Sequence, residues 1–312
     1  MGRRDLVLLT DHSSTEGTRD AMAAAVRRLT GREPVHLDAR HFMTDGTGTG
    51  TGRIEADGDG LARLEAEGRV VTTDTVVVYE IPPHRRPAFA HCQRRLRASG
   101  VRSLGTDAEA WRAATEKDRT VACFDRDGVP HMPTITLPSR PSPEAAAAAF
   151  ERLGGDVWAR PCVGMGGDDV FHVTTHAQLA AAARHYAGLD TAWLIARDAR
   201  NFTPDGQRHQ YRVVVLGGRV VRAVEHVQAD PDAPCNECQG AVSTLLEVDE
   251  LPPGLAELAV SATKSIGLPL AGVDLAAESG GVVFEVNVHP AFGHDRGVEQ
   301  IAVPYVAAHL RP

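Results

Sequence analysis

The chain has 312 residues, 43% of them hydrophobic, and a formal net charge of −8. This length allows one large domain or two or three small ones, each with a buried core. No apolar run approaches the ~18 residues of a membrane-spanning helix, and the acidic balance argues against broad nucleic-acid binding. We therefore expect a globular protein without a membrane or nucleic-acid partner.

The first 105 residues predict an α/β domain. Its expected elements are a strand, a helix, two strands and a basic helix, at residues 5–10, 15–29, 34–38, 76–79 and 84–99. The βαβ opening indicates a parallel sheet. The arginines of the basic helix are interpreted as a solvated face, with gripping of an acidic substrate as the alternative. The glycine-rich segment 44–52 lacks the Lys-Ser/Thr of a phosphate loop, so we reject that function for it.

Two further segments are predicted, a small α+β segment at residues 106–190 and a largely β segment at 191–312. Further helices are expected from Thr106 and at residues 117–127, 141–155, 251–266 and 297–310. Strands are expected after Gly128 and at residues 156–160, 193–197, 210–216 and 220–228, and a strand and helix together at 170–187. Glycines 217 and 218 predict a tight turn between two of these strands.

The N-terminus and the cysteines indicate the compartment. Basic residues precede an apolar run that stops at Asp11, which favours a first strand over a secretory signal. Five scattered cysteines, an odd number, favour a reducing cytoplasm. Cys235 and Cys238 form one CxxC motif, which we interpret as two thiols in a polar loop because no second pair accompanies them.

A hairpin near the C-terminus, residues 272–292, concentrates the oxygen donors. Two strands rich in β-branched residues flank Gly280-Gly281, and antiparallel pairing can bring Asp274 opposite Glu285 and Asn287. Two carboxylates and an amide oxygen suit Mg²⁺, which expects substrate phosphates to complete its shell. The alternative is an ordinary hairpin with a solvated polar face, but apolar residues surround the three on both sides.

Cations and glycines elsewhere suggest an anionic ligand. Arg212 lies in the middle of an apolar strand, where it needs an anionic partner such as phosphate or the acidic metal site. The loop Gly164-Met165-Gly166-Gly167 allows close backbone approach to phosphate, although a glycine-rich turn is an equal alternative. Arg160 precedes this loop, and Lys117 begins a helix, where a solvated lysine is the default.

Taken in order, these motifs resemble the ATP-grasp superfamily, in the branch of the ribosomal-protein glutamate ligases (RimK-type) and related peptide-modifying ligases. The resemblance covers residues 107–310, and residues 1–105 match only as a generic pre-ATP-grasp α/β domain. The motifs are Lys117 with Gly128-Val-Pro, Arg160-Pro with Gly164-Met-Gly-Gly, Tyr211-Arg-Val-Val-Val-Leu-Gly-Gly, Asn236 with Gly240, Gly272-Val-Asp-Leu and Glu285-Val-Asn-Val-His-Pro.

The resemblance implies an ADP-forming ligase that activates a carboxylate as an acylphosphate and forms an amide with an amine. It places two Mg²⁺ ions, with Mn²⁺ as a substitute, on Asp274, Glu285 and Asn287, and counts Arg212, Glu285 and Asn287 as catalytic. The nucleotide residues it implies are Lys117, Arg160, Gly164, Met165, Gly166, Gly167, Ile195, Arg197 and Asp198. Physically this is positioning and charge neutralisation.

Two positions depart from the family pattern. Arg160 stands where a lysine is usual, which keeps the charge but alters the geometry toward phosphate. The nucleotide hinge, which normally carries a glutamate, reads Leu194-Ile-Ala-Arg-Asp. Asp198 is then the candidate for the ribose contact, and Ile195 and Arg197 for backbone contacts to adenine.

Three hypotheses for function follow. The first is a ligase of amino acids or other small molecules in specialised metabolism such as antibiotic biosynthesis, including γ-glutamyl or dipeptide ligation. The second is a ligase of a ribosomal peptide or protein, and the third is a non-catalytic nucleotide-binding regulator. Substrate contacts are assigned to Asn236, Gly240, His289 and Glu80. The oligomeric state is left open, with a homodimer as one option.

Overall fold

The computed structural model describes residues 5–44, 48, 50–291 and 296–310. Its helices and sheets form the predicted combination of an α/β part with a parallel sheet and α+β parts with antiparallel sheets. The chain divides into two compact units. Unit 1 comprises Met1–Arg112, Leu268–Leu270 and His289–Pro312, and unit 2 comprises Ala113–Gly267 and Ala271–Val288. The predicted segment 44–52 and the end of the predicted hairpin, Phe292, fall partly or wholly outside the described residues.

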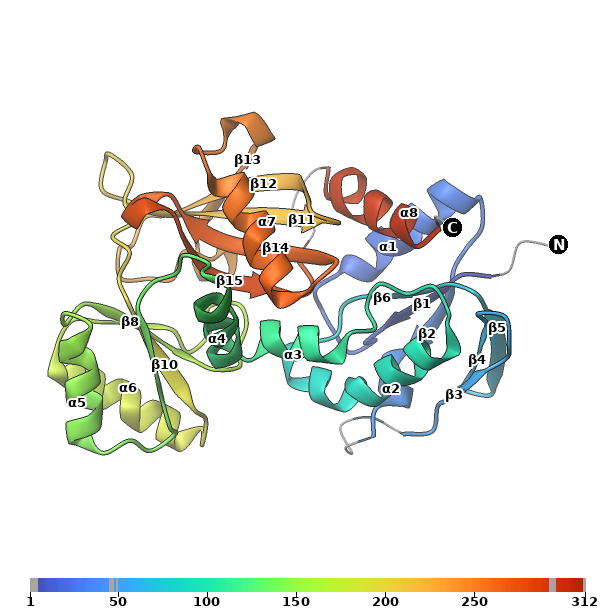
Figure 1. Ribbon diagram of the computed structural model, residues 1–312, viewed down its shortest axis with the longest axis horizontal. Helices are drawn as coiled ribbons and strands as arrows, with labels where there is room; N and C mark the ends of the chain where they lie inside the picture. Colours follow the sequence, from blue (N-terminus) through green and yellow to red (C-terminus); the bar gives the residue numbers. More distant parts are fainter. Residues whose placement is uncertain (1–4, 45–47, 49, 292–295, 311–312) are drawn as a thin grey trace. The chain divides into compact units, whose positions relative to one another are not determined.

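Unit 1 is built on a parallel sheet of order β2-β1-β6. Its strands are β1 Val7–Thr10, β2 Val35–Asp38 and β6 Val76–Val78. The helices are α1 Thr18–Thr30, α2 Arg86–Ser99, α3 Ala108–Thr115, which runs on into unit 2, and α8 Val303–Leu310. Helices α1 and α8 lie side by side (Figure 1). The predicted βαβ opening is confirmed.

A second sheet in unit 1 was not predicted from the sequence. Its antiparallel strands are β3 Arg53–Ala56, β4 Ala62–Ala66 and β5 Arg69–Thr73. Only β4 alternates cleanly, burying Ala62, Leu64 and Ala66, while charged residues fill the positions between them. Two of these three apolar side chains are single methyl groups, so the period-2 signal is weak.

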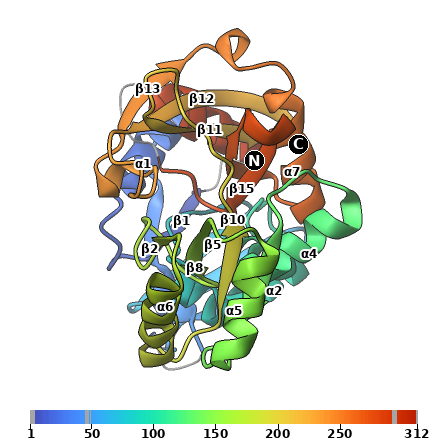
Figure 2. The same cartoon turned by 90° about the vertical axis from the view of Figure 1, so that its left-hand side faces the viewer.

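The first sheet of unit 2 has the order β7-β10-β8-β9 and is antiparallel. Its strands are β7 Thr134–Leu137, β8 Val157–Pro161, β9 Phe171–Val173 and β10 Trp193–Arg197. Helices α5 Pro143–Arg152 and α6 His176–Gly188 lie side by side against one face (Figures 1 and 2). Val157, Ala159 and Ile195 fill that core, so Trp158 and Arg160 point to the opposite face.

The second sheet of unit 2 has the order β13-β12-β11-β14-β15. Its strands are β11 Arg208–Leu216, β12 Arg219–Gln228, β13 Val242–Leu246, β14 Leu270–Ala276 and β15 Val282–Asn287. Helix α7 Leu255–Ile266 packs on this sheet and on α4 Lys117–Asp127. The predicted turn at Gly217 and Gly218 is confirmed, since both have positive φ.

The described helices bear on two sequence predictions. None of them is both long and apolar enough to cross a membrane. The predicted helix at 297–310 is one turn of π-helix, Val298–Ala302, followed by α8. The predicted division at residue 105 lies close to Arg112, and most of the predicted segment 106–190 falls in unit 2. The predicted segment 191–312 is divided, because its last residues, His289–Pro312, belong to unit 1. The three-domain boundaries themselves stay a prediction.

Candidate functional site: a carboxylate hairpin ringed by cations

The hairpin of β14 and β15 places its three oxygen-bearing side chains on one face. Asp274 lies directly opposite Glu285 in the antiparallel ladder, and the amide nitrogen of Asn287 donates to Asp274 Oδ2 at 3.1 Å. A register shift follows Asp274, which separates this polar face from the apolar end of the hairpin. The predicted juxtaposition of the three residues is therefore confirmed, whereas their role as metal ligands stays a prediction.

Arg212 on the neighbouring strand β11 is the partner of Asp274. Its Nε and Nη2 donate to the two oxygens of Asp274 at 2.7 and 2.8 Å, a bidentate pair. Burial disfavours the charged guanidinium, but the Asp274 carboxylate outweighs that penalty and raises the pKa of Arg212. Of the two anionic partners predicted for Arg212, the structure supplies the acidic cluster.

Two more cations surround Glu285. Lys117 Nζ lies 3.1 Å from Glu285 Oε1, and Arg160 Nη1 lies 4.0 Å from Oε2. Arg160 also donates to the carbonyl of Phe284 at 2.9 Å. Lys117 is only 6% exposed, so it is not the solvated lysine that its helix-start position suggested by default. Burial lowers the pKa of Arg160, and the Glu285 carboxylate acts in the opposite direction.

The glycine loop meets this cluster through Lys117, whose Nζ donates to the carbonyl of Gly164 at 3.4 Å. Gly167 has φ +76°, and a Cβ there would lie 3.0 Å from Cγ of Gln239. The Gln239 side chain in turn donates to the carbonyl of Gly166 at 3.3 Å. Close approach and backbone conformation both require glycine at position 167, while Met165 is exposed.

The charges of the cluster favour an anionic ligand together with a cation that prefers oxygen. Three cations (Lys117, Arg160 and Arg212) face two carboxylates (Asp274 and Glu285), which leaves a net charge of +1. The hydrogen bond from Asn287 to Asp274 uses the amide nitrogen, and the amide oxygen is the atom that a metal ion would take as a ligand. Carboxylate and amide oxygens on paired strands fit Mg²⁺.

The 234–240 segment, against which the glycine loop packs, contains two of the predicted substrate residues. Asn236 Oδ1 accepts from the backbone N–H of Cys238 at 2.9 Å and begins a short 3₁₀ turn, which Gly240 ends with φ +92°. Cys235 is buried and Cys238 is exposed, and neither forms a disulfide. These contacts explain Asn236 and Gly240 as turn residues, and substrate binding by them stays a prediction.

The predicted adenine and ribose residues have protein partners. Ile195 is fully buried in the helix-covered core, and β10 is paired with β7 and β8 on both sides. The backbone N–H of Arg197 donates to the carbonyl of Pro133 at 3.0 Å, and the Asp198 carboxylate accepts two hydrogen bonds from Arg208. In this arrangement the N–H of Arg197 is already used, so the adenine contact assigned to it would need another backbone group.

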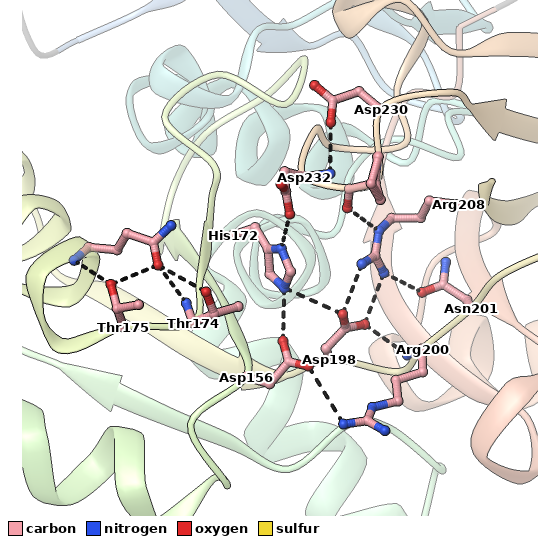
Figure 3. A network of polar contacts seen from close by, with 12 residues as sticks. Asp156, His172, Thr174, Thr175, Asp198, Arg200, Asn201, Arg208, Asp230 and Asp232 are labelled. Carbon is pink, nitrogen blue, oxygen red and sulfur yellow. Dashed lines mark hydrogen bonds and ion pairs between the residues drawn. The ribbon is translucent and has the colours of Figure 1, made fainter. Parts of the chain in front are cut away.

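Sequence reasoning missed a dense network around Asp198 (Figure 3). Arg208 donates to both oxygens of Asp198 at 2.9 Å and lies over the rings of Trp158 and Phe202. His172 stacks on Trp158 and contacts Asp156, Asp198 and Asp232. The sequence signal for this network was the alternation of polar side chains along β11. Arg208, Gln210 and Arg212 are two residues apart, which predicts that they share one face of the strand.

Glu80 and His289 belong to unit 1. Glu80 accepts from the hydroxyl of Thr18 at 2.6 Å and from the backbone N–H of Arg19 at 2.8 Å, so it caps α1. His289 packs against Tyr79 and Trp111, with ring centroids 4.6 and 4.8 Å away, and burial lowers its pKa. Their assignment to substrate stays a prediction, and Glu80 has a structural role that the sequence did not reveal.

Residues 157–302 match the sequence model of the RimK-like ATP-grasp domain. These residues, just under half of the chain, are therefore similar to a RimK-like ATP-grasp domain. A probable alpha-L-glutamate ligase of Enterobacter sp. (strain 638) is 26% identical over 189 residues, which cover 60% of this chain and 59% of that protein. A probable alpha-L-glutamate ligase of Parasynechococcus marenigrum (strain WH8102) is 28% identical over 214 residues, which cover 67% of this chain and 44% of that protein. The match therefore spans less than two thirds of these relatives' length.

Solved structures extend the ATP-grasp fold over the whole chain. D-cycloserine synthetase DcsG has a TM-score of 0.68 at 18% identity, covering 98% of this chain and 99% of that one. ATP-grasp ligase PsnB, complexed with minimal precursor, Mg and ADP, has a TM-score of 0.67 at 16% identity, covering 98% of both. The predicted fold class and the RimK-type resemblance are confirmed.

Proposed function

We propose that the protein is an ADP-forming carboxylate–amine ligase that acts on amino acids or other small substrates in specialised metabolism. One observation carries the proposal: in an ATP-grasp fold, the carboxylate–amide hairpin is ringed by Lys117, Arg160 and Arg212. Similarity to ligases that form amide or peptide bonds supports the reaction class.

In the proposed reaction, a carboxylate oxygen attacks the γ-phosphorus of ATP, the bond to the ADP oxygen breaks, and an acylphosphate forms. An amine then attacks the acyl carbon, phosphate leaves with the bonding electrons, and the nitrogen loses a proton. Lys117 and Arg160 orient the triphosphate, and Arg212 holds Asp274 in place. Bound Mg²⁺, held by Glu285, Asn287 and Asp274, would neutralise phosphate charge.

The protein supplies positioning and charge in this proposal. Glu285 contacts two of the three cations, so binding of metal and nucleotide would exchange those contacts for phosphate oxygens and the ion. The Gly164–Gly167 loop lies beside Lys117, because Lys117 donates to the carbonyl of Gly164. A loop with these glycines can approach phosphate closely.

The test is ADP release with Mg²⁺ across a panel of amino acids and dipeptides, with products identified by mass. We expect Glu285→Ala to lower ADP formation by at least about a hundredfold while the protein stays folded. Glu257→Ala, at an exposed carboxylate on α7, is the matched control and should keep full activity. Unchanged turnover in Glu285→Ala would remove the metal assignment, and a wild type inactive throughout would favour a non-catalytic nucleotide-binding protein.

A peptide substrate is the second candidate. Similarity to PsnB, a ligase complexed with a precursor peptide, is the observation that favours it. Adding synthetic peptides with acidic side chains to the same panel separates the two candidates. A peptide product lighter by the mass of one water would indicate an amide bond formed within the peptide. If no free amino acid were ligated in the same panel, a peptide substrate would replace the small-substrate proposal.

A further inference from the structure

The β8–β9 hairpin carries the glycine loop at its turn, and one of its side chains reaches the loop 229–241 between β12 and β13 (Figure 3). Nδ1 of His172, on β9, lies 2.6 Å from Oδ1 of Asp232 in that loop. The other nitrogen, Nε2, lies 2.8 Å from Asp156 and 3.5 Å from Asp198, which adjoin β8 and β10 of the hairpin's own sheet. One imidazole ring therefore joins the hairpin to the loop 229–241.

The position of His172 between carboxylates favours its protonated form. A carboxylate only accepts hydrogen bonds, and a neutral imidazole has a single N–H, so only the imidazolium can donate on both sides. Of the facing carboxylates, Asp198 is already paired with Arg208, and Asp156 lies 3.9 Å from the exposed Arg200. The remaining negative charge stabilises the imidazolium. The arrangement in the structure is therefore the one that the protonated ring makes.

Loss of one proton forces the ring to give up one side. The side chains of Asp156 and Asp198 are 32% and 3% exposed, so water cannot readily replace the ring there. The side chain of Asp232 is 75% exposed, and water can take the place of the ring at little cost. The neutral ring therefore keeps the inner carboxylates and releases Asp232.

The loop 229–241 is anchored without the hairpin. Nε of Arg208 donates to the carbonyl of Pro231 at 2.9 Å, and Asp230 accepts from the backbone N–H of Asp232 at 3.0 Å. Strand β9, by contrast, has only three residues and stands at the edge of its sheet, paired with β8. When the contact is lost, the hairpin is thus the part that moves.

Two further contacts join the glycine loop to the loop 229–241, and both are weak. The side chain of Gln239 donates to the carbonyl of Gly166 and to Oδ1 of Asp168, each at 3.3 Å and each exposed to solvent. Long, exposed hydrogen bonds contribute less than the short, charge-assisted one of His172. The state of this ring therefore decides whether the two loops stay together.

We propose that His172 is a pH-dependent latch, which as an imidazolium holds the glycine loop against residues 229–241 and as a neutral imidazole releases it. That the glycine loop covers a nucleotide rests on the proposed ligase function, whereas the latch itself operates in the free chain. The loop 229–241 also contains Asn236 and Gly240, the predicted substrate residues. Release would therefore separate the predicted nucleotide loop from the predicted substrate segment.

The experiment measures closure of the glycine loop in the full chain without ATP. A bimane label is attached to the exposed Cys238, next to Gln239, after Cys123→Ser removes the other accessible thiol. Met165→Trp places an indole, which quenches bimane on contact, beside Gly166. Relative to the labelled chain that keeps Met165, fluorescence should be at least about twofold lower at pH 5.5 than at pH 8.5, on either side of the imidazole range. Equal quenching at both pH values would overturn the latch.

Three variants assign the response. His172→Phe keeps a ring to stack on Trp158 but has no N–H, so quenching should be lost at both pH values. Asp232→Ala should behave alike, and this exposed substitution leaves the core untouched. His185→Gln is the matched control, because His185 contacts Asp169 of the same hairpin at 2.8 Å from its own sheet. A pH response that vanishes in His185→Gln and persists in His172→Phe would contradict the proposal.

A second readout separates the latch from the ligase function. Glu285→Ala should keep the fluorescence response of the free chain whether or not the protein is a ligase. If the loop covers the nucleotide, a fluorescent ADP analogue should dissociate at least about threefold faster at pH 8.5 than at pH 5.5, and at equal rates from Asp232→Ala. A fluorescence response with unaltered nucleotide release would support the latch and exclude a nucleotide-covering loop.

Discussion

The two units show two ways of burying an ionisable side chain. Unit 1 keeps its buried histidines neutral among aromatic rings, and burial lowers the pKa of His309 to about 4. Unit 2 buries charges in pairs, such as Arg208 with Asp198 and Arg212 with Asp274. A neutral ring costs little to desolvate, whereas a buried charge needs a partner. The difference teaches that the arginine–carboxylate pairs of unit 2 can exchange an ionic partner for a charged ligand, which the neutral histidines of unit 1 cannot do.

The largest effect should come from breaking a buried pair in unit 2. Arg208→Leu leaves the Asp198 carboxylate buried without its bidentate partner, and we expect the free energy of unfolding to fall by about 3–5 kcal/mol. Urea unfolding monitored by circular dichroism measures it. Arg97→Ala is the control, because the Arg97–Asp107 pair of unit 1 is exposed and should contribute less than about 1 kcal/mol. Equal losses in the two variants would erase the contrast between buried and exposed pairs.

Acid should weaken unit 1 through His309. Its Nε2 accepts from the backbone N–H of Leu104 and its Nδ1 donates to the carbonyl of Tyr305, which requires a neutral ring. The folded pKa lies below the unfolded one, so stability present above pH 6.5 is lost as the pH falls toward about 4, by on the order of 3 kcal/mol.

His309→Gln isolates that contribution, because an amide can accept and donate at the same two places without titrating. The difference in unfolding free energy between pH 6.5 and 4 should be smaller in this variant than in wild type by about the same 3 kcal/mol. If the unfolding free energies of His309→Gln and wild type changed equally with pH, His309 would not be the group responsible.

His209 in unit 2 should show the opposite sign. Burial disfavours its charge, but hydrogen bonds to Glu225 at 2.7 Å and Glu278 at 3.0 Å outweigh this and raise its pKa. Its contribution is therefore present below pH 6.5 and is lost as the pH rises through the folded pKa. At pH 6, His209→Gln should cost about 1.5–3 kcal/mol by urea unfolding, and the cost should shrink above neutrality. A cost that grows with pH would exclude the charged pair.

The smallest effect is expected at the cap of α1. Glu80→Gln keeps the shape but removes the charge that faces the helix N-terminus, so it should cost about 0.5–1 kcal/mol in thermal or urea unfolding. Turnover at saturating substrate should be unchanged if Glu80 is only a cap. A large rise in KM without loss of stability would instead support the substrate contact predicted from sequence.

Local signals in the sequence determined much of the fold and of the candidate site. Period-2 and helical apolar patterns located most strands and helices, because burial of one face imposes those periods. The alternation of Glu285 and Asn287, with Asp274 across a glycine turn, was enough to place three oxygen donors together. The order of the glycine and cation motifs was enough to indicate the ATP-grasp family.

Only the tertiary structure decided which partner each charge meets. Nothing near Lys117 in the sequence shows that it is buried against Glu285, and nothing near Asp198 shows that Arg208 holds both its oxygens. Likewise, Nδ1 of His289 accepts from the backbone N–H of Ile81, which lies 208 residues away along the chain. Such contacts join distant segments, so local propensity is silent about them, and their energies depend on burial that exists only once the chain has folded.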